Sequence, residues 1–189
     1  ILGSSSRIGI GTTAPSVPLH VSAGTNAPLT LETTDLGGDI TLKSTANTPA
    51  DGSTIMALRW EAKDDAGNNT VYGIAQCNVD SDANGAEKGS FNFILANAAG
   101  GNTERMTIEG DRKVGIGTTA PDGLLHVHSA SAGSVTAHTG ADELIVEGSG
   151  ATGISILCPN NQVGTINFGD AANHVAGAIY YNHDSDGLH

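Results

Sequence analysis

Several short stretches of the chain alternate apolar and polar residues with a period of two. Clusters of Gly, Asn, Asp and Pro bound these stretches, as is typical of short β-strands joined by turns. The stretches are LTLE at Leu29–Glu32, DITLKS at Asp39–Ser44, VYGIAQCNV at Val71–Val79, SFNFIL at Ser90–Leu95 and RMTIEG at Arg105–Gly110. Because neighbouring side chains of a strand point to opposite faces, the pattern predicts an all-β fold built from half-apolar strands.

One window, Ser53–Ala66, fits either a helix or a strand. It contains several good helix formers, yet Met56, Leu58 and Trp60 alternate with polar or small residues. We predict a strand here. The AGNN sequence that begins at Ala66 then predicts the turn of a hairpin leading into Val71.

A repeat organises the chain. Residues 8–21 read IGIGTTAPSVPLHV and residues 114–127 read VGIGTTAPDGLLHV, with ten of fourteen positions identical. The similarity resumes between VYGIAQCNVDSD at Val71 and VAGAIYYNHDSD at Val175. We therefore predict two tandem units, because self-similarity at a fixed period marks a repeat architecture.

The two units have the following predicted boundaries. The first spans residues 1–110, with a narrow segment or neck at 8–21 and a β-rich part at 22–110. The second is incomplete and spans residues 111–189, with a neck at 114–127 and a β-rich part at 128–189.

The composition supplies little material for a monomeric core. Leu, Ile, Val and Phe account for 40 of 189 residues, Gly for 26, and the net charge is −12. A chain with so few large apolar residues and such a charge lies near the limit of independent folding. We expect it to bury apolar surface against copies of itself.

The charge and the cysteines exclude several classes of protein. Only eight Lys and Arg are present, none after Lys113, so we expect no nucleic-acid partner. No stretch is apolar enough for a membrane span, and residues 1–7 lack a signal-peptide pattern. Cys77 and Cys158 fit no metal-binding spacing and are predicted to be free, buried thiols.

The run ERMTIEGDRKVGIGTTAPDGLLHV, at Glu104–Val127, resembles a repeat of bacteriophage tail fibres and tailspikes that often precedes an intramolecular chaperone domain. The segments LRWEAKDD, DSDANG, SFNFILAN and GAIYYNHDSDGL resemble the hairpins of such units, so the resemblance covers nearly the whole chain. No chaperone domain or cleavage site is visible in it. The resemblance implies an elongated, parallel homotrimeric fibre segment in the virion tail, assembled in the host cytoplasm and used in host attachment. Its partners would be other tail proteins and a host surface glycan or protein.

The neck residues are the structural candidates. Gly9, Gly11, Gly115 and Gly117 either allow three backbones to meet at an axis or supply positive φ at a turn. In each LHV strand the Leu and Val share one face and the His takes the other. If Leu19, Val21, Leu125 and Val127 face the axis, both His126 and His128 point outward, and His126→Asp should be tolerated better than Leu125→Asp.

Three motifs resemble cofactor or metal sites, but none of them is complete enough to predict one. GIGTTA at Gly9 matches a dinucleotide fingerprint, with Asp35 at the ribose position, but Pro15 and Pro18 prevent the required helix. Asp80, Asp82 and Asn84 match the start of a calcium loop whose last ligand is missing, so a solvated hairpin turn is favoured. His126 and His128 are weak candidates for an axial metal. We expect no cofactor.

Two rival functions remain open. Glycan hydrolysis requires paired carboxylates across a groove, whereas Asp64 with Asp65 and Asp142 with Glu143 are sequence neighbours, so we expect no enzyme activity. Glycan binding requires aromatic side chains, and Trp60, Tyr72, Tyr180 and Tyr181 are predicted to pack in the core instead. A bacterial surface adhesin, or the non-catalytic part of a depolymerase tailspike, is the alternative reading.

Overall fold

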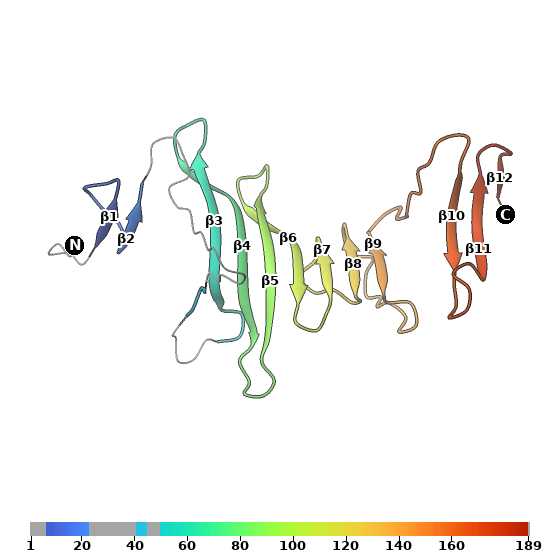
Figure 1. Ribbon diagram of the computed structural model, residues 1–189, viewed down its shortest axis with the longest axis horizontal. Helices are drawn as coiled ribbons and strands as arrows, with labels where there is room; N and C mark the ends of the chain where they lie inside the picture. The colour runs from blue at the N-terminus through green and yellow to red at the C-terminus, as the bar shows by residue number, and fades with distance from the viewer. Residues whose placement is uncertain (1–6, 23–40, 45–49, 189) are drawn as a thin grey trace, which may run out of the picture. The chain divides into compact units, whose positions relative to one another are not determined.

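The computed structural model describes residues 7–22, 41–44 and 50–188, and it is all-β (Figure 1). The described residues form twelve strands in three sheets. They contain no helix that is long and apolar enough to cross a membrane. The all-β prediction is confirmed. The chain divides into two compact units, Ile1–Leu42 and Lys43–His189.

The largest sheet has seven strands in sequence order, β3 to β9, as Figure 1 shows. Its members are β3 (Thr54–Lys63), β4 (Asn69–Ser81), β5 (Lys88–Ala96), β6 (Asn102–Glu109), β7 (Val114–Ile116), β8 (Leu125–His128) and β9 (Leu144–Glu147). Pairing is antiparallel from β3 to β7 and parallel from β7 to β9. Two crossover loops, residues 117–124 and 129–143, make the parallel connections without a helix.

Two smaller sheets lie before and after the large one in the sequence. The first pairs β1 (Ile8–Ile10) with β2 (Leu19–Val21) in parallel. The second is an antiparallel meander of β10 (Val163–Phe168), β11 (Gly177–Asn182) and β12 (Gly187–Leu188). The two neck segments of the sequence therefore both form parallel strand pairs.

Most of the predicted strands are present. The window Ser53–Ala66 contains β3, which confirms a strand rather than a helix, and the three stretches that begin at Val71, Ser90 and Arg105 lie in β4, β5 and β6. LTLE lies outside the described residues. DITLKS was predicted as a strand, but its described part, Thr41–Ser44, forms none.

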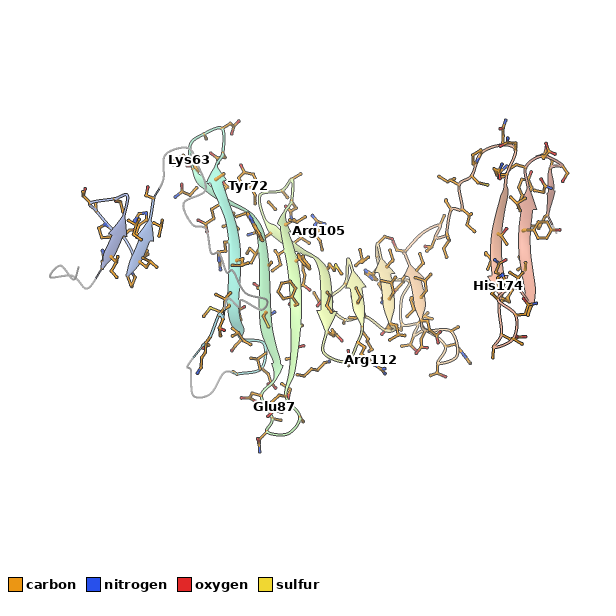
Figure 2. All side chains as sticks on the ribbon, in the orientation of Figure 1. Lys63, Tyr72, Glu87, Arg105, Arg112 and His174 are labelled. Atoms are coloured by element: carbon orange, nitrogen blue, oxygen red, sulfur yellow. The ribbon has the colours of Figure 1, made fainter. Side chains whose placement is uncertain are left out.

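The predicted hairpin turn joins β3 to β4. Gly67 adopts φ +84°, and the Asp64 carboxylate accepts hydrogen bonds from the backbone N–H groups of Ala66 and Asn68. Those bonds, chiefly the one from Asn68, lower the pKa of Asp64. The figures show the turns of the sheet clearly, with Lys63 beside this one, Glu87 at the β4–β5 turn and Arg112 at the β6–β7 turn (Figure 2).

The unit boundary that the sequence predicts after residue 110 falls in the β6–β7 turn. The strands on its two sides, β6 and β7, pair in the same sheet through Met106–Ile116 and Ile108–Val114. The division into two repeat units stays a prediction.

The buried apolar core is small. Among the described residues, the buried apolar side chains apart from Pro121 are Ile74, Ala75 and Val79, and these three belong to β4. A domain of this length normally buries most of its large apolar residues. The described apolar side chains are therefore largely on the surface of the single chain.

Candidate association surface and histidine cluster

The strand register of the large sheet gathers apolar side chains on one face. Two rows of paired residues cross all seven strands, and every position in both rows is apolar. The first row is Met56, Cys77, Phe91, Ile108, Val114, Leu125 and Leu144, and the second is Leu58, Ala75, Phe93, Met106, Ile116, Val127 and Val146. We call these fourteen residues the apolar face.

The apolar face is partly open to solvent in the single chain: six of its fourteen residues are exposed, seven are half-buried and Ala75 is buried. Leu58 is 55% exposed and Leu144 is 52% exposed, and Phe91, Phe93 and Ile116 are exposed as well. On strand β5, Phe91, Phe93 and Leu95 are exposed, while the polar residues that alternate with them at positions 90 and 92 are buried. This is the reverse of the usual half-buried strand, in which the apolar side faces the core.

The opposite face is held together by polar side chains. The Asn92 amide donates to Thr107 Oγ1 at 3.1 Å and accepts from Asn78 Nδ2 at 3.1 Å. Ser90 donates to Asp80 Oδ1 at 2.8 Å. Asn92 is only 5% exposed, and buried amides need such partners, so these bonds fix the register of β4, β5 and β6.

The two neck motifs adopt the same local structure. In each, the first strand pairs in parallel with the LHV strand, and equivalent backbone bonds close the loop between them. These bonds are Ile8 N–H to Pro18 O at 2.7 Å and Val114 N–H to Leu124 O at 2.8 Å. The motif histidine accepts from the backbone in both copies, from Ser16 to His20 Nδ1 and from Asp122 to His126 Nδ1, each at 3.3 Å.

The neck glycines are required by the chain's own crossover loops. Gly11 and Gly117 have φ of +73° and +79°, which matches the second of the two explanations offered by the sequence. A Cβ on Gly9 or Gly115 would meet the carbonyl oxygen of Thr12 or Thr118. The side chains of Leu125 and Val127 lie on the apolar face, and Leu19 pairs with Ile8 in the separate β1–β2 sheet.

His126 lies on the face opposite Leu125 and Val127, as the alternation predicts, but that face is covered in the single chain, and His126 is 2% exposed rather than accessible. Two features cover His126. Its partner in the register, Gly115, has no side chain, and the first crossover loop, residues 117–124, folds over this face. Burial of His126 counts against the prediction that His126→Asp is tolerated better than Leu125→Asp, which stays a prediction. His128 is more accessible, at the end of β8.

Glu147 on β9 meets both histidines. Its Oε2 lies 3.0 Å from His126 Nε2 and 3.9 Å from His128 Nε2, and its Oε1 accepts from the Ala132 backbone N–H at 2.6 Å. The His126 contact is short but not well aligned as a hydrogen bond. The Ala132 bond lowers the pKa of Glu147, and the imidazoles add to this effect against the opposing effect of burial. Glu147 thus links β8 to the second crossover loop.

Asp122, His126 and Glu147 each bring a possible metal ligand within 4.8 Å of the others. A metal-bound histidine normally donates its second ring N–H to an acceptor. The Nδ1 of His126 instead faces a donor, the backbone N–H of Asp122, which leaves the ring proton on Nε2 beside Glu147. The arrangement suits a histidine that braces the loop better than one that binds a metal.

The other sequence candidates lie in turns. Asp82 and Asn84 are in the β4–β5 turn, where Gly85 adopts φ +82°, and Asp80 ends β4 bonded to Ser90. The pair Asp64 and Asp65 is in the β3–β4 turn. Asp142 and Glu143 precede β9, where their carbonyl groups accept from Leu124 and Leu125.

The prediction that the large aromatic residues pack in a core is wrong for the single chain. Trp60, Tyr72, Tyr180 and Tyr181 are all exposed in the single chain. Trp60 continues the apolar face on β3 and lies over Gly73 of β4. The two cysteines are free, as predicted, but half-buried rather than buried.

The β10–β12 sheet also has an uncovered apolar side. A shallow hollow there is lined by Ile156, Gly164, Ile166, Ile179, Tyr181 and Leu188. The hydroxyl of Tyr181 donates to Asp186 Oδ1 at 2.6 Å, and this bond raises the pKa of Tyr181.

Comparison with known proteins gives no relative: no family model matches the chain, and no curated protein matches its sequence.

Sequence reasoning missed Glu147, Asn92 and Thr107. The alternation of β5 did place Asn92 opposite the phenylalanines, but nothing in the sequence indicated which face is covered.

Proposed function

We propose that this chain is a non-enzymatic structural segment of a bacteriophage tail fibre or tailspike, working in host attachment as a parallel homotrimer. The observation that carries the proposal is the apolar face: fourteen apolar residues in two unbroken rows across seven strands, six of them exposed in the single chain.

Such a face needs a partner. Each large apolar side chain moved out of water contributes about 1.5–3 kcal/mol, so leaving both rows hydrated forgoes most of the stabilisation available to the sheet.

A second and third copy of the chain are the partners that this surface fits. The net charge of −12 makes copies repel one another in general, but the apolar face carries no charged residue. Identical chains can therefore approach closely through this face. Closed symmetry also limits the number of copies and protects the apolar strands from uncontrolled pairing.

The tail-fibre assignment rests on the resemblance of the GIGTT-type motif, which occurs twice and in the order typical of that family. The matching geometry of the two copies supports it: both form a parallel strand pair closed by the same backbone and histidine bonds. A trimer with Leu19, Val21, Leu125 and Val127 toward its axis is the arrangement we propose for the necks.

The test is the oligomeric state of the full chain and of two neighbouring variants on β3. Light scattering should give three times the 19.0 kDa chain mass. Leu58→Asp places a carboxylate on the apolar face and should abolish the trimer. Arg59→Asp is the matched control: it changes the charge by more, but its side chain is on the opposite face and exposed. A monomeric native chain, or equal loss of trimer in both variants, would refute the proposal.

A further inference from the structure

The segment Gly153–Cys158, sequence GISILC, lies between β9 and β10 and belongs to neither (Figure 1). It runs without a turn or bend, and within the described part of the chain none of its backbone N–H or C=O groups makes a hydrogen bond. It has the sequence of a strand, with Ile and Leu around a single Ser and no charge. It is an extended, apolar segment without a neighbouring strand.

The side chains of this segment are placed asymmetrically. A Cβ on Gly164 of β10 would lie 3.3 Å from Ile156 and 3.7 Å from the Cys158 sulfur, so these two side chains rest over β10. Leu157, between them, points away and is 91% exposed. Ile154 is largely exposed as well. Ile156 and Cys158 thus contact the segment's own sheet, whereas Leu157 and Ile154 are largely exposed.

We infer that Gly153–Cys158 forms a β-strand between chains, pairing its backbone with a strand of a neighbouring copy in the assembly. Exposed apolar side chains are buried by association, and any backbone that becomes buried must find hydrogen-bond partners. An extended backbone finds them by joining the edge of a sheet, which is a general mode of strand addition. This inference rests on the proposed self-association. It identifies the segment through which the chains would form backbone hydrogen bonds with one another.

The neighbouring copy is a better occupant than another segment of the same chain. The segment is tied closely to β10 through Ile156 and Cys158, and its free side faces away from that sheet. The other chains of the assembly bring the same uncharged, apolar chemistry to it. A polar or charged partner would gain nothing from Ile154 and Leu157.

Hydrogen exchange of the native full-length assembly tests the pairing. The amides of Ile154–Cys158 should exchange at least about tenfold more slowly than those of Val135–Ala137, an internal control with no regular structure and no backbone hydrogen bond to another described residue. A matched pair of variants tests the side chains. Leu157→Asp should lower the melting temperature of the trimer by roughly 5 °C or more. Val135→Asp, in the second crossover loop and 67% exposed, should leave it unchanged.

The outcomes separate the two proposals. If the protein is trimeric but Ile154–Cys158 exchanges as fast as the control, or Leu157→Asp melts like the native assembly, the interchain strand is refuted and the trimer stands. If the native chain is monomeric, both fall. Misfolding of Leu157→Asp is not a concern, because in the single chain that side chain touches almost nothing.

Discussion

At the scale of single residues, the most informative contact is the one between Glu147 and the loop it holds. Its carboxylate accepts the Ala132 backbone N–H at 2.6 Å and faces the imidazoles of His126 and His128. His126 in turn accepts the Asp122 N–H from the first crossover loop. The Glu147 carboxylate therefore holds the second crossover loop, and the His126 imidazole holds the first.

This contact predicts a pH dependence. Because the pKa of Glu147 is lowered in the folded state, its ionised form stabilises the fold above the unfolded value of about 4.5. That contribution is lost as the pH falls through the lower folded-state pKa. Glu147→Gln should therefore reduce the free energy of unfolding at neutral pH, and the deficit should shrink in acid.

Denaturant unfolding between about pH 3 and pH 7 measures this effect. Glu61→Gln is the control, because it removes the same charge from an exposed position on β3. A deficit for Glu147→Gln that is constant across the whole range would show that the carboxylate contributes no pH-dependent stability.

At the scale of elements, the neck is a parallel strand pair whose connection is only a short loop. Parallel strands usually need a longer crossover, often a helix. Here the eight residues 117–124 suffice, because the glycines let the loop return directly over the strands. The same bonds in both copies indicate that the motif sequence encodes this geometry locally.

Gly117 should tolerate substitution less well than a glycine of equal backbone conformation elsewhere. Gly85 has φ +82° and an open surrounding, so Gly85→Ala should cost only the left-handed strain of about 1–2 kcal/mol. Gly117 has φ +79°, and a Cβ there would also collide with the carbonyl oxygen of His128. Gly117→Ala should therefore lose clearly more in thermal or denaturant unfolding, and equal losses would contradict the steric account of the neck.

At the scale of the whole molecule, the main feature is the seven-stranded sheet. Side chains on its polar face hydrogen-bond to one another, whereas much of its apolar face is exposed. The hydrogen-bonded ladder of Asn78, Asn92 and Thr107 holds the strands in register without help from another chain. The apolar rows have no such cover. Assembly is thus expected to act on a sheet that already has its register set.

Cys77 reports on this feature, because it stands in the first apolar row between Met56 and Phe91. In the native assembly its thiol should react slowly with a maleimide, since the partner chains cover the row. In the Leu58→Asp variant the same thiol should react at least about tenfold faster, because it is half-buried only by its own sheet. Mass spectrometry of the labelled peptide distinguishes Cys77 from Cys158, and equal rates for Cys77 in both proteins would place the interface elsewhere.

The alternation of residues and the turn chemistry determined the strands themselves. Met56, Leu58 and Trp60 share one side because the period of a strand is two, and that local rule placed β3 despite the helix formers around it. The prolines and glycines of the neck determined extended backbone and positive φ in the same way. These properties depend on near neighbours along the chain, so they can be read from the sequence.

The tertiary structure alone decided which face is covered and which residues meet across the sheet. Leu125 and Val127 are the more apolar side of β8, so the sequence favoured burial for them and exposure for His126. In the single chain His126 is buried and both apolar residues are only half-buried, because the crossover loop and Glu147 of β9 close over the histidine side. Contacts between residues distant in sequence depend on register and loop path, and burial follows from those contacts rather than from the apolarity of a residue by itself.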